Sequence, residues 1–166
     1  MGALRLKLTL SVTAYLATIV AANWALETWG IVTVAGLTVP AGVWFAGLSF
    51  GLRDIVQEEC GRLWTVGAIL VGAGLSWFIS PTFAVASGVA FLVSELADFA
   101  VYTPLRDRRW VTAVVASNVV GSVIDSVLFL WLAFGWAAVS SGWVDLTIGK
   151  TLMILPALAL MWLVRR

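Results

Sequence analysis

Histidine is absent from this sequence, cysteine occurs once, and charged residues are few. A single cysteine, Cys60, cannot form an internal disulfide, and the usual His/Cys ligand sets of zinc sites and iron–sulfur clusters are missing. The same absence removes the general base of a Ser-His-Asp triad. We therefore expect no cofactor and no metal site, and the composition does not indicate an enzyme.

The shortage of charge places the chain in a membrane. Charged residues make up 11% of the 166 residues and hydrophobic residues 61%, whereas soluble domains carry about 25% charged residues. The mean hydropathy is +1.02, so the lipid bilayer is an expected partner. A formal net charge of +1 gives no reason to expect a nucleic-acid partner.

Six apolar segments approach the length of a membrane span, which takes about 20 helical residues. Such segments should be helices, because backbone groups in lipid need internal partners and the alternating pattern of a β-barrel is absent. The segments cover residues 8–26, 39–56, 63–79, 83–102, 110–134 and 146–164. The sequence predicts an all-α membrane protein, a compact bundle of six transmembrane helices forming one domain over residues 1–166.

Basic residues predict the orientation of this bundle. The connections at 27–38, 80–82 and 135–145 contain no Lys or Arg. The start, the end and the other two connections hold Arg5, Lys7, Arg62, Arg106, Arg108, Arg109, Arg165 and Arg166. Basic residues collect on the cytoplasmic side, so we expect a multi-pass protein of the cytoplasmic (inner) membrane with both termini in the cytoplasm.

Four carboxylates lie inside these apolar segments: Asp54, Glu95, Asp98 and Asp125. A charge at the bilayer centre costs roughly 2.5–3.5 kcal/mol on insertion scales. A chain that repeats this cost uses the groups to bind or move something polar. The leading interpretation is a transporter.

Helical spacing groups these acids with other polar and aromatic side chains. Glu95, Asp98 and Tyr102 share one helix face, with Phe91 one turn before Glu95. On the next segment the same spacing aligns Asn118, Ser122, Asp125 and Phe129.

Three times an acid stands four residues from a phenylalanine, in the pairs Phe50/Asp54, Phe91/Glu95 and Asp125/Phe129. A carboxylate accepts two hydrogen bonds from adjacent N–H groups, and a neighbouring ring can stack. This combination suits a planar, nitrogen-rich heterocycle.

The alternative is a structural ion-pair network, in which Lys150 or Arg53 neutralises an acid. The acids outnumber these two bases, and the surplus indicates proton coupling or a cationic substrate. For Arg53 itself we expect an interfacial helix end, where its side chain snorkels to the surface.

The motifs resemble those of the queuosine precursor transporter family, also called the VUT or vitamin-uptake-type family. An acid followed by Asn-Glu and Tyr-Gly resembles Asp54 to Gly61, although Gln57 replaces Asn and Cys60 replaces Tyr. Further matching positions are Ser94, Glu95, Asp98, Tyr102, Arg106, Ser117, Gly121, Asp125, Ser126, Phe129 and Phe134, with Asn23, Lys150 and Pro156 also similar. The resemblance covers nearly the whole chain and is most specific over 94–134.

The resemblance implies import of a purine-like small molecule, 7-cyano- or 7-aminomethyl-7-deazaguanine, bound at mid-membrane. We expect Glu95 and Asp125 on the edge of the base, Asp98 as their neighbour or proton carrier, and Phe91 or Phe129 as stacking platform. Further candidates for this site are Asp54, Asn23, Lys150, Tyr102 and Asn118.

Three rival interpretations remain. Ala17-x-x-x-Ala21 resembles the docking motif of the substrate-binding subunits of energy-coupling-factor importers, and only under that reading is an ATPase module a partner. A non-transporting membrane scaffold and a membrane-embedded enzyme acting through the acid cluster are the others. Assembly into a homo-oligomer is left open by the sequence.

Overall fold

The computed structural model describes residues 2–106, 108–153, 155–156 and 159. These form six helices and a two-stranded hairpin, in the order α1 (Gly2–Trp29), β1 (Ile31–Val34), β2 (Leu37–Pro40), α2 (Val43–Cys60), α3 (Arg62–Trp77), α4 (Pro81–Arg106), α5 (Trp110–Phe134) and α6 (Trp136–Leu152). Each of the first five predicted segments overlaps a helix, so the hydropathy pattern located α1 to α5 correctly.

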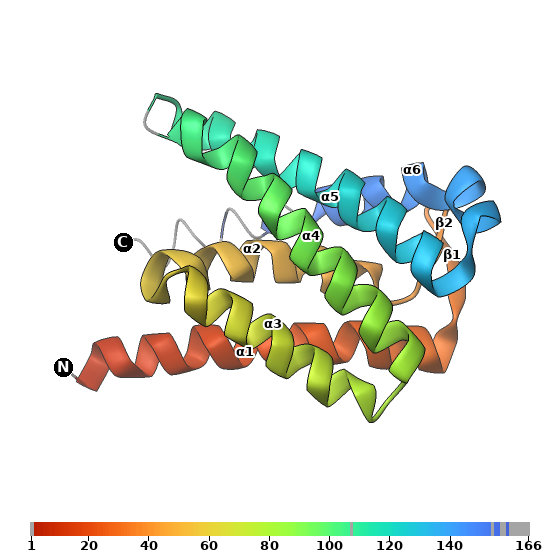
Figure 1. The fold of residues 1–166 in the computed structure, drawn as a ribbon, viewed down its shortest axis with the longest axis horizontal. Helices are drawn as coiled ribbons and strands as arrows, with labels where there is room; N and C mark the ends of the chain where they lie inside the picture. Colours follow the sequence, from red (N-terminus) through yellow and green to blue (C-terminus); the bar gives the residue numbers. More distant parts are fainter. Residues whose placement is uncertain (1, 107, 154, 157–158, 160–166) are drawn as a thin grey trace.

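The helices pack as a bundle whose junctions alternate between its two ends (Figure 1). The start of α1, the α2–α3 junction and the α4–α5 junction lie at one end. The hairpin, the α3–α4 junction and the α5–α6 junction lie at the other. Gly61 and Gly135 form the α2–α3 and α5–α6 junctions with φ of 85° and 84°, a left-handed conformation that glycine adopts without steric cost.

The hairpin between α1 and α2 corrects the expected all-helical fold, which left 27–38 as a connection. Strands β1 and β2 pair antiparallel, with Val34 opposite Leu37. The two turn residues Ala35 and Gly36 both have positive φ, 52° and 84°, as in the type I′ turns that suit two-residue hairpin loops. Alternating Val and Thr on both sides of Ala35-Gly36 was the signal in the sequence.

Helix α6 also differs from its prediction. The sequence segment 146–164 was expected to be the sixth helix, whereas α6 begins at Trp136 and ends at Leu152. The residues of 135–145, expected as a connection, therefore supply its first turns. Most of the predicted segment after Met153 lies outside the described residues.

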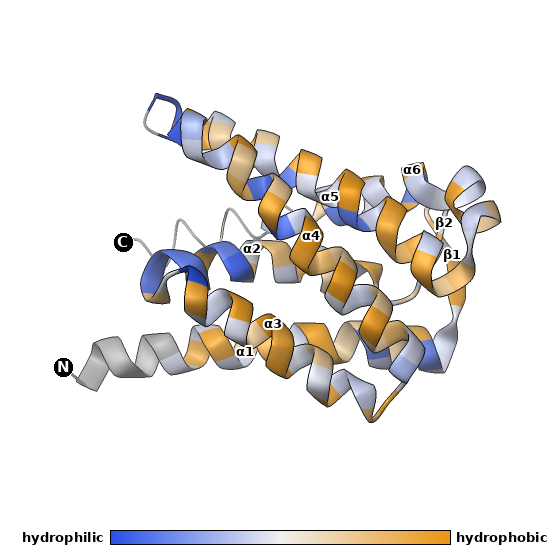
Figure 2. Cartoon of the chain, viewed as in Figure 1, coloured by the Kyte–Doolittle hydropathy of each residue, from blue (hydrophilic) through white to orange (hydrophobic). Residues whose placement is uncertain are grey.

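The polarity of the bundle is that of a membrane protein. Charged side chains such as Arg53, Glu95 and Lys150 are buried, while Leu70 and Leu96 are 58% and 66% exposed. Figure 2 shows hydrophobic residues along the helices of the bundle. Many large apolar side chains are exposed, and a large exposed apolar surface marks contact with lipid. Within the described residues, Thr9–Trp29, Pro81–Arg106 and Val111–Phe134 qualify as spans by length and composition. Six spans with cytoplasmic termini stay a prediction.

Labelling of single cysteines tests the orientation. Cys60 ends α2, at the end of the bundle with the basic junctions, so a membrane-impermeant thiol reagent added to intact cells should leave it unlabelled. In a Cys60→Ala background, Ser141→Cys on an exposed turn of α6 should be labelled readily. Labelling of Cys60 but not of the Ser141→Cys variant would reverse the predicted orientation.

Candidate functional site

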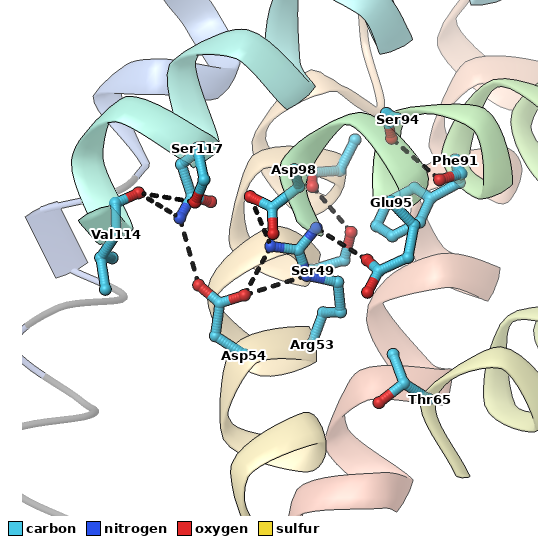
Figure 3. A network of polar contacts seen from close by, with 12 residues as sticks. Ser49, Arg53, Asp54, Thr65, Phe91, Ser94, Glu95, Asp98, Val114 and Ser117 are labelled. Atoms are coloured by element: carbon cyan, nitrogen blue, oxygen red, sulfur yellow. Dashed lines mark hydrogen bonds and ion pairs between the residues drawn. The ribbon is translucent and has the colours of Figure 1, made fainter. Parts of the chain in front are cut away.

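Arg53 is the centre of a buried charged cluster that joins α2 to α4 (Figure 3). Its Nη2 lies 2.5 Å from Asp54 Oδ1 and 3.2 Å from Asp98 Oδ1, and its Nη1 lies 2.8 Å from Glu95 Oε2. One cation faces three carboxylates, so the cluster has a surplus of negative charge when all three are ionised. We call these four residues the Arg53 cluster.

The position of Arg53 corrects the expectation that its side chain snorkels at a helix end. Its side chain is 0% exposed. Helix α2 continues to Cys60, about two turns beyond Arg53, which therefore lies within the bundle rather than at its edge. Burial of a guanidinium requires charged partners, and the three acids supply them.

Helix α5 is tied to this cluster through Asn118. The Asn118 amide donates to Asp54 Oδ2 at 3.1 Å and to the Val114 carbonyl at 2.8 Å. Asp54 thus accepts bonds from Arg53 on its own helix and from α5. Three helices, α2, α4 and α5, are linked by one set of polar contacts.

A second buried pair joins α5 to α6. Lys150 Nζ donates a hydrogen bond to Asp125 Oδ2, and the two residues are 3% and 5% exposed. The ammonium also lies 5.8 Å from the centre of the Phe129 ring. This pair is neutral as a unit, in contrast to the Arg53 cluster.

The Asp125–Lys150 pair borders a cavity between the helices, here called the apolar cavity. Its volume is about 60 Å³, and its wall includes Asn23, Phe91, Asp125, Phe129 and Lys150, with Pro40 and Gly42 of the hairpin side. Asn23 is held by hydrogen bonds to the hydroxyls of Ser76 and Ser87 at 3.2 and 3.3 Å. An apolar wall with a few fixed polar groups is typical of small-molecule sites.

A second cavity of about 420 Å³, here called the polar cavity, lies on the other side of the Arg53 cluster. It is lined by Asp54, Gln57, Glu58, Asp98, Tyr102 and Val114, together with Arg106. Tyr102 and Arg106 belong to the last turns of α4, next to the basic α4–α5 junction. This cavity therefore belongs to the end of the bundle predicted to face the cytoplasm.

The structure distributes the predicted site over these two cavities. Asn23, Phe91, Asp125, Phe129 and Lys150 line the apolar cavity, and Asp54, Asp98 and Tyr102 line the polar cavity. Glu95 and Asn118 lie in the charged layer between them. Glu95 and Asp125, expected on one edge of the base, are each paired with a different cation.

Sequence reasoning missed three contributors to the site. Ser76 and Ser87 fix the amide of Asn23, but serines in apolar helices are common and carry no distinctive signal. Tyr15 on α1 is fully buried with its ring centre 6.3 Å from that of Phe91. As the one tyrosine of α1, it shows no spacing pattern that could have singled it out.

Comparison with known protein families gives one match. Residues 78–165, more than half of the chain, match the family model described as "Putative vitamin uptake transporter". No protein with a curated description and no solved structure is significantly similar to the chain. The matched residues hold Glu95, Asp98, Asp125 and Lys150, and the match confirms the resemblance found in the sequence.

Burial of the Asp125–Lys150 pair predicts how substitutions of these residues change the free energy of unfolding. Asp125→Asn or Lys150→Met alone leaves a buried charge without its partner and should lower the free energy of unfolding by about 3–5 kcal/mol. The double variant removes both charges and should cost clearly less than the sum. Thermal unfolding of the purified proteins measures this, with Glu27→Gln at an exposed position as a control expected to change little. Additive losses would show that the two side chains do not interact.

Proposed function

Because the chain belongs to the vitamin uptake transporter family, a family of membrane transporters, we propose that it imports a queuosine precursor across the cytoplasmic membrane. The substrate is 7-cyano- or 7-aminomethyl-7-deazaguanine. Support for this substrate comes from the motif resemblance over 94–134 and from the chemistry of the apolar cavity. The protein works as a six-span, multi-pass transporter with both termini in the cytoplasm.

One observation carries the proposal: a carboxylate and an ammonium lie side by side in the wall of the apolar cavity. The pairing edge of a guanine-type base presents a carbonyl oxygen, a ring N–H and an amino group in a row. Lys150 donates to the carbonyl, and Asp125 accepts from the two N–H groups. The paired residues therefore match this edge in the order of its donors and acceptors, and they leave the complex with a neutral base uncharged.

Aromatic rings complete the site. Phe91 and Phe129 both line the apolar cavity, and a base between two helices can stack on either ring. A volume of about 60 Å³ holds about four water molecules, which is less than a two-ring base needs. The described conformation is thus a contracted one, and substrate entry requires the surrounding helices or rings to move apart.

Salvage of queuosine tests the function in cells. A host that neither makes 7-deazaguanines nor has its own transporter should regain queuosine in transfer RNA when it carries this chain and receives the precursor. The chain should suffice without an added ATPase, because the proposed transporter works alone. Rescue that requires an ATPase module would favour the energy-coupling-factor alternative. Failure with both precursors despite normal membrane expression would remove the substrate assignment.

Direct binding tests the assigned residues. The Asp125→Asn/Lys150→Met double variant keeps the cavity without its two charges and is expected to fold. It should bind 7-cyano-7-deazaguanine about ten- to hundredfold more weakly, because buried donors on the base lose their acceptors. Asp145→Asn is the matched control. Its carboxylate lies on α6, five residues from Lys150, but bonds the Thr38 backbone N–H at 2.9 Å. Equal affinity in the double variant and the control would contradict the site.

A further inference from the structure

Helices α2, α4 and α5 each contribute residues to both cavities, and the residues between those positions separate the two cavities. On α2, Ser49 lines the apolar cavity and Asp54 lines the polar one. On α4 the corresponding residues are Phe91 and Asp98. On α5 they are Asp125 and Val114. The residues between these positions form a partition that is about one and a half turns thick on α2, two turns on α4 and three turns on α5.

The partition is closed by two kinds of contact. Phe50 of α2 stacks on Phe91 of α4, with ring centres 4.8 Å apart and planes at 30°. The Arg53 guanidinium lies 5.5 Å from the centre of the Phe50 ring and pairs with Glu95 and Asp98 across to α4. Arg53 and Phe50 are 0% and 1% exposed. A substrate in the apolar cavity therefore meets a sealed layer before it can reach the polar cavity.

Helix α5 lies next to this layer at Gly121. A Cβ at this position would lie 3.6 Å from the Phe50 ring and 3.7 Å from the Asp98 Cβ. The third helix thus packs directly on the aromatic and charged contacts of the other two.

We propose that Arg53 is the gating residue of transport: while it is paired with Glu95, its guanidinium lies across the passage and closes it, and release of this pair lets the guanidinium turn aside and opens the passage. The distribution of acids suits this role. When Arg53 leaves Glu95, it keeps Asp54 and Asp98 on the side of the polar cavity, so the guanidinium stays paired throughout. An unpaired buried charge would make such a motion far more costly.

When Arg53 leaves Glu95, the Glu95 carboxylate becomes free to accept hydrogen bonds. It lies between the two cavities, where the N–H groups of a passing base need an acceptor. This second role of Glu95 rests on the proposed substrate, whereas the gate itself follows from the partition. The two acids therefore have different roles. Asp125 binds the substrate in the closed state, and Glu95 accepts its hydrogen bonds during passage.

Thiol accessibility tests the gate without any substrate. In a Cys60→Ala background, Ala46→Cys reports on the apolar cavity and Val114→Cys on the polar cavity, since both residues line them. A membrane-impermeant reagent is applied to right-side-out and inside-out vesicles. One face of the membrane should give the reagent access to the Val114→Cys reporter. From that same face, the Ala46→Cys reporter should react only slowly. Adding Glu95→Gln or Arg53→Lys should raise its rate from that face about tenfold or more, and adding Glu27→Gln should not.

Two results would overturn the proposed gate. An unchanged rate at the Ala46→Cys reporter in both variants, or loss of the thermal unfolding transition in both, would make Arg53 a structural clamp and overturn the gate. With 7-cyano-7-deazaguanine as probe, Glu95→Gln should keep binding affinity within about threefold while uptake is lost. A binding loss of tenfold or more at unchanged accessibility would make Glu95 a direct ligand instead. If the base fails to bind the wild type, the labelling result still stands, so the two proposals fail separately.

Discussion

A fully buried arginine is the constraint on which the rest of this bundle depends. The guanidinium of Arg53 cannot lie among apolar helices without acceptors, and Glu95 and Asp98 on α4 and Asp54 on α2 provide them. Asn118 extends the contacts to α5. These requirements fix how three helices are rotated toward one another. The division of the interior into an apolar and a polar cavity follows, because the charged cluster fills the level between them.

The inward-facing positions of the polar residues on α4 and α5 could be predicted from helical spacing alone. The period of 3.6 residues placed Glu95 with Asp98 and Asn118 with Asp125 on inward faces, because a helix segment has few other places for such groups in lipid. Arg53 could not be placed in the same way. Its neighbours Asp54, Gln57, Glu58 and Glu59 make the segment polar enough to resemble a helix end. Only the ion pairs with Glu95 and Asp98 of α4 show that Arg53 lies inside the bundle.

The sequence offered Arg53 and Lys150 as partners of the buried acids, and both do form ion pairs with them, but which acid each base pairs with could not be predicted. Spacing orders residues along one helix but does not state which helix lies opposite. Lys150 reaches Asp125 because α6 approaches the bundle closely. A Cβ on Gly47 would lie 2.8 Å from the Lys150 carbonyl, and one on Gly149 would lie 2.8 Å from Val43 Cγ2. Lys150 lies in the last turn of α6 because the helix ends at Leu152, whereas hydropathy predicted a segment that only begins at 146.

The Asp125–Lys150 pair and the Arg53 cluster differ in net charge, so the two sides of the interior are electrostatically different. Asp125 and Lys150 cancel each other beside the apolar cavity, so the site proposed there for a neutral base has no net charge. The polar cavity shares Asp54 and Asp98 with the Arg53 cluster and adds Glu58 and Arg106, so its side of the interior keeps the surplus of negative charge that the cluster has when its acids are ionised. For the proposed substrate, this surplus favours hydrogen-bond donors and a cationic aminomethyl group in the passage. The same charge disfavours an anion, so under this proposal the electrostatics of the passage contribute to selectivity together with the shape of the site.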